Sequence, residues 1–193
     1  MKNMKYLGTK KLETKRLILR RFKIEDAEAM YNNWASNPNV SKYVMWETHK
    51  DVNETKELLE EWVKGYENST TFRWVAQTKD TNELIGSIDV VSKKYLQFGV
   101  CEIGYCYGED FWNQGYGTEC LQAVIKYLFE ECDVDVICAE HLSQNPGSGK
   151  VMQKCGLRHE GTRRGRFIDA DGIRNDLLSY SITKDEYKKL NRK

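Results

Sequence analysis

Apolar and polar residues in the first half of the chain follow the pattern of β-strands. Strand-like segments occupy residues 17–22, 72–78, 84–91 and 100–107. The turn Lys79-Asp80-Thr81-Asn82 joins the second segment to the third. The last three segments therefore predict a meander of antiparallel strands.

Two stretches between these strands have apolar residues at helical spacing instead. The first consists of Ala27, Met30, Tyr31 and Trp34, and Asn37-Pro38-Asn39 breaks it. The second consists of Leu58, Leu59, Trp62, Val63 and Tyr66, with Asp51 and Asn53 ahead of it as possible caps. Both stretches predict helices with one buried face.

The second half of the chain predicts a different order of elements. A glycine-rich turn at 114–117 opens a helix whose apolar side spans 120–129, and a buried strand follows at 134–142. A short helix is expected at 148–155, and the last strands at 158–168 and 177–183. The sum is a mixed sheet flanked by helices, which is an α+β or mixed α/β single domain over residues 1–193.

Composition narrows the classes of protein that fit this pattern. Thirty Lys plus Arg residues against 29 Asp plus Glu give a net charge of +1, which argues against general nucleic-acid binding. No apolar run reaches the roughly 20 residues of a membrane span, and the polar start lacks the apolar core of a signal peptide. Six cysteines without a Cys-x-x-Cys pair and three histidines predict no metal site. We expect a cytoplasmic protein with no nucleic-acid or membrane partner.

The segment 112–119 lies between a predicted strand and a predicted helix. The first turn of a helix presents unpaired main-chain N–H groups and a partial positive charge, and Gly115 and Gly117 let an anion approach them closely. The segment therefore suits a phosphate group, and the Thr118 hydroxyl could add a further bond. A tight turn that only starts a helix explains the same residues.

Several further motifs follow one another at specific spacing. They are Glu102-Ile103-Gly104-Tyr105, Gly115 to Glu119, Asn145 with Ser148, and Lys154 with Gly156-Leu157, after an opening run from Leu12 to Arg20. In this order they resemble the GNAT superfamily of acyl-CoA-dependent N-acetyltransferases. The branch that they resemble most is the RimJ/RimL-like one, which acetylates the N-termini of ribosomal proteins. The resemblance covers residues 12–183, which would be the core of the domain.

The resemblance implies a site for acetyl-CoA. The strands 100–107 and 134–142 would be parallel and splayed, with the pantetheine arm between them. The residues at the glycine turn would bind the pyrophosphate, namely Gln114, Gly115, Tyr116, Gly117 and Thr118. Asn145 and Ser148 would contact the pantetheine end, and the main chain at Tyr105 and Cys106 would stabilise the oxyanion.

The chemistry needs a base, because only the neutral amine attacks a thioester. Glu102 is the candidate, and a solvated or ion-paired glutamate is the alternative reading of the same position. Many GNAT enzymes place a tyrosine four residues before the closing glycine of the short helix, where this chain has Met152. Ser148 is therefore the candidate proton donor to the leaving thiolate, or else a plain helix N-cap.

Three weaker candidates concern the acceptor. Trp46 lies in an irregular stretch and could line the acceptor pocket, and Asp176 could gather the amine or be a turn carboxylate on the surface. The basic run Arg163, Arg164 and Arg166 could face an acidic peptide, the 3′-phosphate of coenzyme A or water.

The resemblance predicts direct transfer of acetyl from acetyl-CoA to an amine by a monomer or homodimer. A protein N-terminus is the expected acceptor. A small amine such as a polyamine, an amino acid or an antibiotic is the alternative acceptor, and a non-catalytic acetyl-CoA-binding module is the alternative function.

Overall fold

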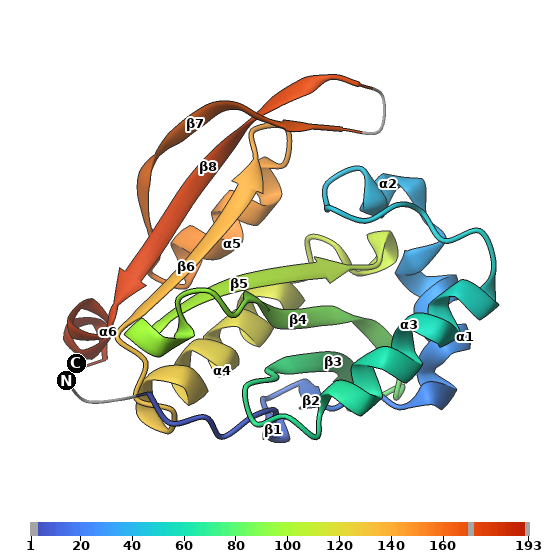
Figure 1. Ribbon diagram of the computed structural model, residues 1–193, viewed down its shortest axis with the longest axis horizontal. Coiled ribbons are helices and arrows are strands. Elements are labelled where there is room, and N and C mark those ends of the chain that lie inside the picture. Colours follow the sequence, from blue (N-terminus) through green and yellow to red (C-terminus); the bar gives the residue numbers. More distant parts are fainter. Residues whose placement is uncertain (1–3, 170–171, 192–193) are drawn as a thin grey trace. The chain divides into compact units, whose positions relative to one another are not determined.

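The computed structural model describes residues 4–169 and 172–191. Within them, eight strands pair in the order β1-β2-β3-β4-β5-β6-β8-β7 (Figure 1). The strands are β1 (Leu12–Glu13), β2 (Leu17–Arg20), β3 (Arg73–Thr78), β4 (Leu84–Ser92), β5 (Val100–Tyr107), β6 (Val136–Leu142), β7 (Arg158–Ile168) and β8 (Arg174–Thr183). The α-helices are α1 (Ala27–Met30), α2 (Pro38–Ser41), α3 (Val52–Gly65), α4 (Tyr116–Glu130), α5 (Pro146–Lys154) and α6 (Lys184–Leu190). The α+β fold class expected from the sequence is confirmed.

The chain divides into two compact units. Unit 1 comprises Met1–Tyr6, Val90–Gly104 and Leu121–Lys193, and unit 2 comprises Leu7–Asp89 and Tyr105–Cys120. The single domain over residues 1–193 stays a prediction.

Unit 2 contains the antiparallel strands β1 to β3 and the helices before α4. A cluster of buried side chains forms its core, namely Phe22, Ala27, Met30, Trp34, Ala35, Val40, Leu59, Val75 and Leu84. Asp51 caps α3, since its Oδ1 accepts from the amides of Asn53 and Glu54 at 2.7 and 3.2 Å. Ala27, Met30 and Trp34 of the first predicted face and Leu59 of the second are buried, and Leu58, Trp62 and Tyr66 pack partly buried against them.

The first predicted helix differs from a regular α-helix. After α1 the chain continues as a π-helical turn, η2 (Tyr31–Ala35). Asn37-Pro38 ends this turn, as predicted, but the same dipeptide also starts α2. Asn37 is the N-cap of α2 and Pro38 occupies its first turn, where a missing N–H costs nothing.

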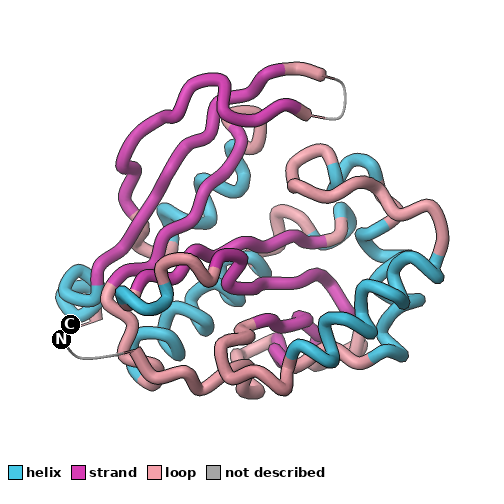
Figure 2. The backbone as a smooth tube through the Cα atoms, in the orientation of Figure 1, coloured by secondary structure: helices cyan, strands magenta, loops and turns pink. Residues whose placement is uncertain are grey.

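Unit 1 contains a parallel pair of strands followed by antiparallel ones. β5 and β6 pair in parallel from Val100 with Val136 to Ile103 with Ala139, as predicted. β6 then pairs antiparallel with β8, and β8 with β7, so that β7 and β8 form a long hairpin (Figure 2).

The helix α5 lies against β6 on one face of this sheet. A Cβ atom on Gly149 of α5 would come within 2.6 Å of His141 Nε2, so the helix passes directly over the His141 ring. Side chains alternate along a strand, so Cys138 and Glu140 occupy the opposite face. We call that face the carboxylate face, because it carries Glu102, Glu140 and Glu160 around Cys138.

Candidate active site

The predicted phosphate-binding turn lies in unit 2 and has the backbone that its role requires. Gly115 has a φ of +82° and Asn113 a φ of +59°, both in the left-handed region that favours glycine and asparagine. The chain then enters α4 at Tyr116. Within the described residues, the amides of Tyr116 and Gly117 have no acceptor, as expected in the first turn of a helix. The turn therefore presents N–H groups that a phosphate could bind.

An ion pair from a distant part of the chain holds this turn. Arg16 Nε donates to Glu119 Oε2 at 2.7 Å, and Arg16 Nη1 donates to the carbonyl of Gln114 at 3.0 Å. The guanidinium also lies over the ring of Tyr116, 4.3 Å from its centroid. Arg16 thus contacts residues on both sides of Gly115.

Glu119 is bonded by more than this arginine. Its Oε1 accepts from the Thr14 hydroxyl at 2.6 Å and from the main-chain N–H of Arg16 at 2.8 Å. Burial raises the pKa of Glu119, but the bonds from Thr14 and Arg16 outweigh burial and hold the pKa below its ordinary value. Glu119 therefore stays ionised and fixes the first turn of α4 to the segment before β2.

Three other predicted residues of unit 2, Cys106, Trp46 and Tyr105, are half-buried. The thiol of Cys106 lies 3.4 Å from the Ser87 hydroxyl, and burial raises its pKa to about 11. Trp46 is half-buried against the core cluster, with its ring centroid 5.7 Å from that of His49. The ring of Tyr105 lies 6.0 Å from that of Tyr107. The Cys106 thiol is thus unsuited to act as a nucleophile, which agrees with direct transfer.

Glu102, the predicted base, lies on the carboxylate face of unit 1. It pairs in register with Cys138 of β6 and is half-buried. Burial raises the pKa of Glu102 above its ordinary value, Glu140 raises it further, and Arg163 lowers it. A carboxylate with a raised pKa is a stronger base, as proton abstraction from an amine requires.

Ser148, the predicted proton donor, lies on the other side of β6 from Glu102. Its place in the helix differs from the prediction. Asn145, not Ser148, is the N-cap of α5, since its Oδ1 accepts from the Ser148 amide at 3.2 Å. Ser148 is the third helical residue and is half-buried. The alternative reading of Ser148 as a plain N-cap is therefore wrong.

His141 lies beneath this helix and has one ring nitrogen without a partner. Its Nδ1 lies 2.8 Å from the Leu142 carbonyl, while Nε2 is buried and has no partner among the described residues. Burial lowers the pKa of His141, so the ring is neutral at neutral pH. The neutral ring packs beneath α5, against Gly149.

Asp176, a candidate for gathering the amine, is part of β8. Its Oδ1 accepts from the Gly165 amide at 2.7 Å and thereby joins the two strands of the hairpin. The described residues contain no group of three or more His, Cys, Asp or Glu side chains that could hold a metal ion. None of the described helices is long and apolar enough to span a bilayer.

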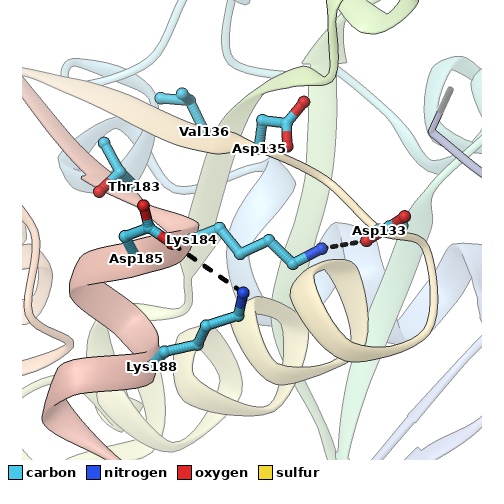
Figure 3. A pocket seen from close by; sticks show the side chains of 7 residues that line it. All are labelled: Asp133, Asp135, Val136, Thr183, Lys184, Asp185 and Lys188. Carbon is cyan, nitrogen blue, oxygen red and sulfur yellow. Dashed lines mark hydrogen bonds and ion pairs between the residues drawn. The ribbon is translucent and has the colours of Figure 1, made fainter. Parts of the chain in front are cut away.

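A polar pocket of about 460 Å³ in unit 1 contains none of the predicted site residues (Figure 3). Its lining residues are Asp133, Asp135, Val136, Thr183, Lys184, Asp185 and Lys188. Lys184 forms an ion pair with Asp133, and Lys188 lies 3.9 Å from Asp185. Because these charges pair with one another, the pocket does not resemble a substrate site.

Sequence reasoning missed two supporting ion pairs. Arg16 and Glu119 are 103 positions apart, and Arg163 and Glu140 are 23 positions apart. The opening run from Leu12 to Arg20 contains Arg16, and the motif Gly115 to Glu119 contains Glu119, each only as part of a resemblance. No spacing rule along the sequence connects either pair.

Comparisons with known proteins agree on one family. A family model described as "Acetyltransferase (GNAT) domain" matches residues 16–158. The chain is 30% identical to the uncharacterized N-acetyltransferase YoaA of Bacillus subtilis, over 90% of this chain and 96% of YoaA. It is 23% identical to the [ribosomal protein uS5]-alanine N-acetyltransferase of Escherichia coli, over 91% of this chain and 92% of the relative. The crystal structure of a GNAT-family acetyltransferase from Bacillus anthracis superposes with a TM-score of 0.79 at 27% identity, covering 91% of this chain and 99% of that one.

Proposed function

The chain belongs to the GNAT family and is an N-acetyltransferase, and from this premise we propose direct transfer from acetyl-CoA to the N-terminal α-amine of a protein. The family implies acetyl-CoA as the donor. The acceptor class is supported by the uS5-alanine N-acetyltransferase, which is similar to this chain over nearly its whole length. An α-amine also loses its proton more readily than a lysine, with a pKa of about 7.7–8.0 against about 10.4.

The observation that carries the proposal is the turn before α4. Its amides at Tyr116 and Gly117 are free of acceptors in the described chain, and Gly115 leaves space that a side chain would fill. Gln114, Gly115, Tyr116, Gly117 and Thr118 would hold the pyrophosphate through the main chain and the Thr118 hydroxyl. Asn145 would contact the pantetheine end.

The remaining assignments concern the transfer itself. Bound acetyl-CoA supplies the acetyl group as a thioester. Glu102 would accept the proton that the amine loses, and the Ser148 hydroxyl would donate to the sulfur. The main-chain N–H groups of Tyr105 and Cys106 would donate to the carbonyl oxygen. Glu102 and Ser148 lie on opposite sides of β6, so Glu102 would release its proton to solvent, and the Ser148 hydroxyl would hydrogen-bond the thiolate until it takes a proton from water.

Release of coenzyme A tests the acceptor class. We would measure it with peptides that differ only in a free or pre-acetylated N-terminus, and with polyamines, amino acids and aminoglycosides. Turnover that needs the free N-terminus supports the proposal. Turnover on small amines alone would mean that the acceptor is a small amine. Saturable binding of acetyl-CoA without release of coenzyme A for every amine would mean that the protein is a non-catalytic binding module.

Two substitutions test the residues. Glu102→Gln should reduce turnover about 10²-fold or more at neutral pH and leave acetyl-CoA affinity nearly unchanged. Glu160→Gln is the matched control, because Glu160 is an exposed carboxylate of the same face that accepts from Ser181 at 2.6 Å. Equal turnover of Glu102→Gln and the control at every pH would remove Glu102 as the base.

Gly117→Trp should weaken acetyl-CoA binding, because the tryptophan side chain would obstruct the main-chain amides of the turn.

A further inference from the structure

We propose that Arg163, held by an ion pair with Glu140, supplies the positive charge beside the Glu102 carboxylate on this face of the sheet. Arg163 is thus a positioning residue, and its role in the reaction rests on the function proposed for Glu102. The pair lies on the carboxylate face of unit 1, where Arg163 of the edge strand β7 reaches Glu140 of β6 across β8.

The register of the strands places these side chains together. Glu102 pairs with Cys138, and Glu140 follows two residues later on the same face of β6. Glu140 in turn pairs with Ser179 of β8, and Leu177, two residues from Ser179 on the same face, pairs with Arg163 of β7. Arg163 therefore extends across β8 to reach Glu140.

Glu140 is held by two donors, one on each carboxylate oxygen. The Ser179 hydroxyl donates to Oε1 at 2.7 Å, and Arg163 Nη2 forms an ion pair with Oε2. The Glu140 side chain is 24% exposed, so this pair is less screened by water than an ordinary surface pair. Two donors fix the orientation of Glu140 and hold the guanidinium near Glu102.

The charges around Glu102 in unit 1 explain why a cation is needed there. Cys138 and Glu140 face it from β6, and Arg163 and Glu160 belong to β7 of the same face. The neighbouring carboxylate of Glu140 favours protonation of Glu102. Arg163 opposes this effect, since it lowers the pKa of Glu102 while burial and Glu140 raise it.

The test is a titration of the Glu102 carboxyl group in the full chain, monitored by NMR with ¹³C-labelled glutamate. The Glu102 signal is assigned by its loss in Glu102→Gln. Arg163→Gln should raise the Glu102 pKa by roughly one unit, the low end for loss of a nearby opposite charge. Glu140→Gln should lower it. A merely structural role would not move the two variants in opposite directions.

Two controls belong to the experiment. Arg163→Lys keeps the charge and should restore most of the original titration. Arg164→Gln removes the same charge from the neighbouring position of β7, where no contact with Glu140 exists in the described chain, and should leave Glu102 unchanged. A Glu102 titration that is identical in wild type and Arg163→Gln overturns the proposal.

The pH profile of turnover separates this inference from the proposed function. If Glu102 is the base, the acid limb of the profile moves with the titration in Arg163→Gln. If the Glu102 pKa shifts in Arg163→Gln while the pH profile of turnover stays unchanged, the charge pair is supported and Glu102 is not the base. In that case the assignment of the base fails and the role of Arg163 in ionising Glu102 stands.

Discussion

The contacts of Arg16 predict that this residue organises the turn proposed for the pyrophosphate. Arg16→Ala removes a 2.7 Å ion pair with Glu119, a 3.0 Å bond to the Gln114 carbonyl and the stack on Tyr116. A hydrogen bond with a charged partner contributes about 1.5–3 kcal/mol, but a solvent-exposed pair only about 0.2–1 kcal/mol. The Arg16 side chain is 41% exposed and that of Glu119 is 19% exposed, so a value between these ranges is appropriate. We expect a loss of about 1–2 kcal/mol in the free energy of unfolding.

The same loss should appear in the affinity for acetyl-CoA. If the variant turn must be ordered on binding, the cost of ordering weakens binding, and 1.4 kcal/mol corresponds to a factor of about ten in Kd. Calorimetric titration should therefore show a Kd raised roughly 5- to 30-fold in Arg16→Ala, with little change in turnover at saturation. Lys11→Ala is a matched control, because Lys11 pairs with Glu13 at 2.8 Å on the surface of the same unit.

Glu119→Gln distinguishes positioning from direct contact with the ligand. Glutamine keeps the shape of Glu119 but loses its charge, and it should weaken acetyl-CoA binding in the same direction as Arg16→Ala. The double variant should cost less than the sum of the two, since the residues contact each other. Unchanged affinity in both single variants would refute the role of the pair. Weaker binding in Arg16→Ala alone would mean that Arg16 touches the ligand itself.

Three further predictions concern other parts of the structure. Because the pKa of Glu119 is lowered in the folded state, its contribution to stability is present above the unfolded pKa of about 4.3 and is lost as the pH falls through the folded pKa. Denaturation at a series of pH values should therefore show that the stability of Glu119→Gln depends less on acid pH than that of the wild type. Gly86→Ala should destabilise the fold by on the order of 3 kcal/mol in urea denaturation, since its Cβ would lie 2.2 Å from the Cys106 carbonyl oxygen; a loss under 1 kcal/mol would contradict this contact. Burial and the surrounding carboxylates raise the pKa of Cys138 to about 11, so at pH 8 roughly one thiol in a thousand is ionised, and alkylation by iodoacetamide should be far slower than for a free cysteine.

The elements that sequence reasoning predicts well are those with a buried face. The apolar positions of α4 at Cys120, Leu121, Val124, Ile125, Leu128 and Phe129 are all buried. Burial of one face is a property of a local segment, so its period is visible in the sequence. The predicted strands likewise agree with β3 to β8 to within a few residues at their ends.

Local capping chemistry was present in the sequence but was assigned to the wrong residue. Asn145-Pro146 gives a capping side chain followed by proline at the first helical position, which indicates a helix starting at Pro146. The sequence pattern predicts a helix over 148–155, which begins two residues later than α5 does. The π-helical turn at Tyr31–Ala35 gave no such signal, since its apolar spacing is close to that of an α-helix.

The two arginine–glutamate pairs show why the sites themselves are less predictable than the strands. In each pair a half-exposed arginine contacts a glutamate from a different element, and in each the glutamate accepts a second bond from a hydroxyl, of Thr14 or of Ser179. The near-neutral balance of charge conceals such pairing, because paired and solvated charges count equally in a composition. The pairs differ in what they hold, so their removal should differ in kind. Loss of Arg16 loosens a main-chain turn and should change affinity, whereas loss of Arg163 changes the field at a carboxylate and should change pH dependence. Two variants that lost stability but changed neither the affinity for acetyl-CoA nor the pH profile would show that the pairs serve only stability.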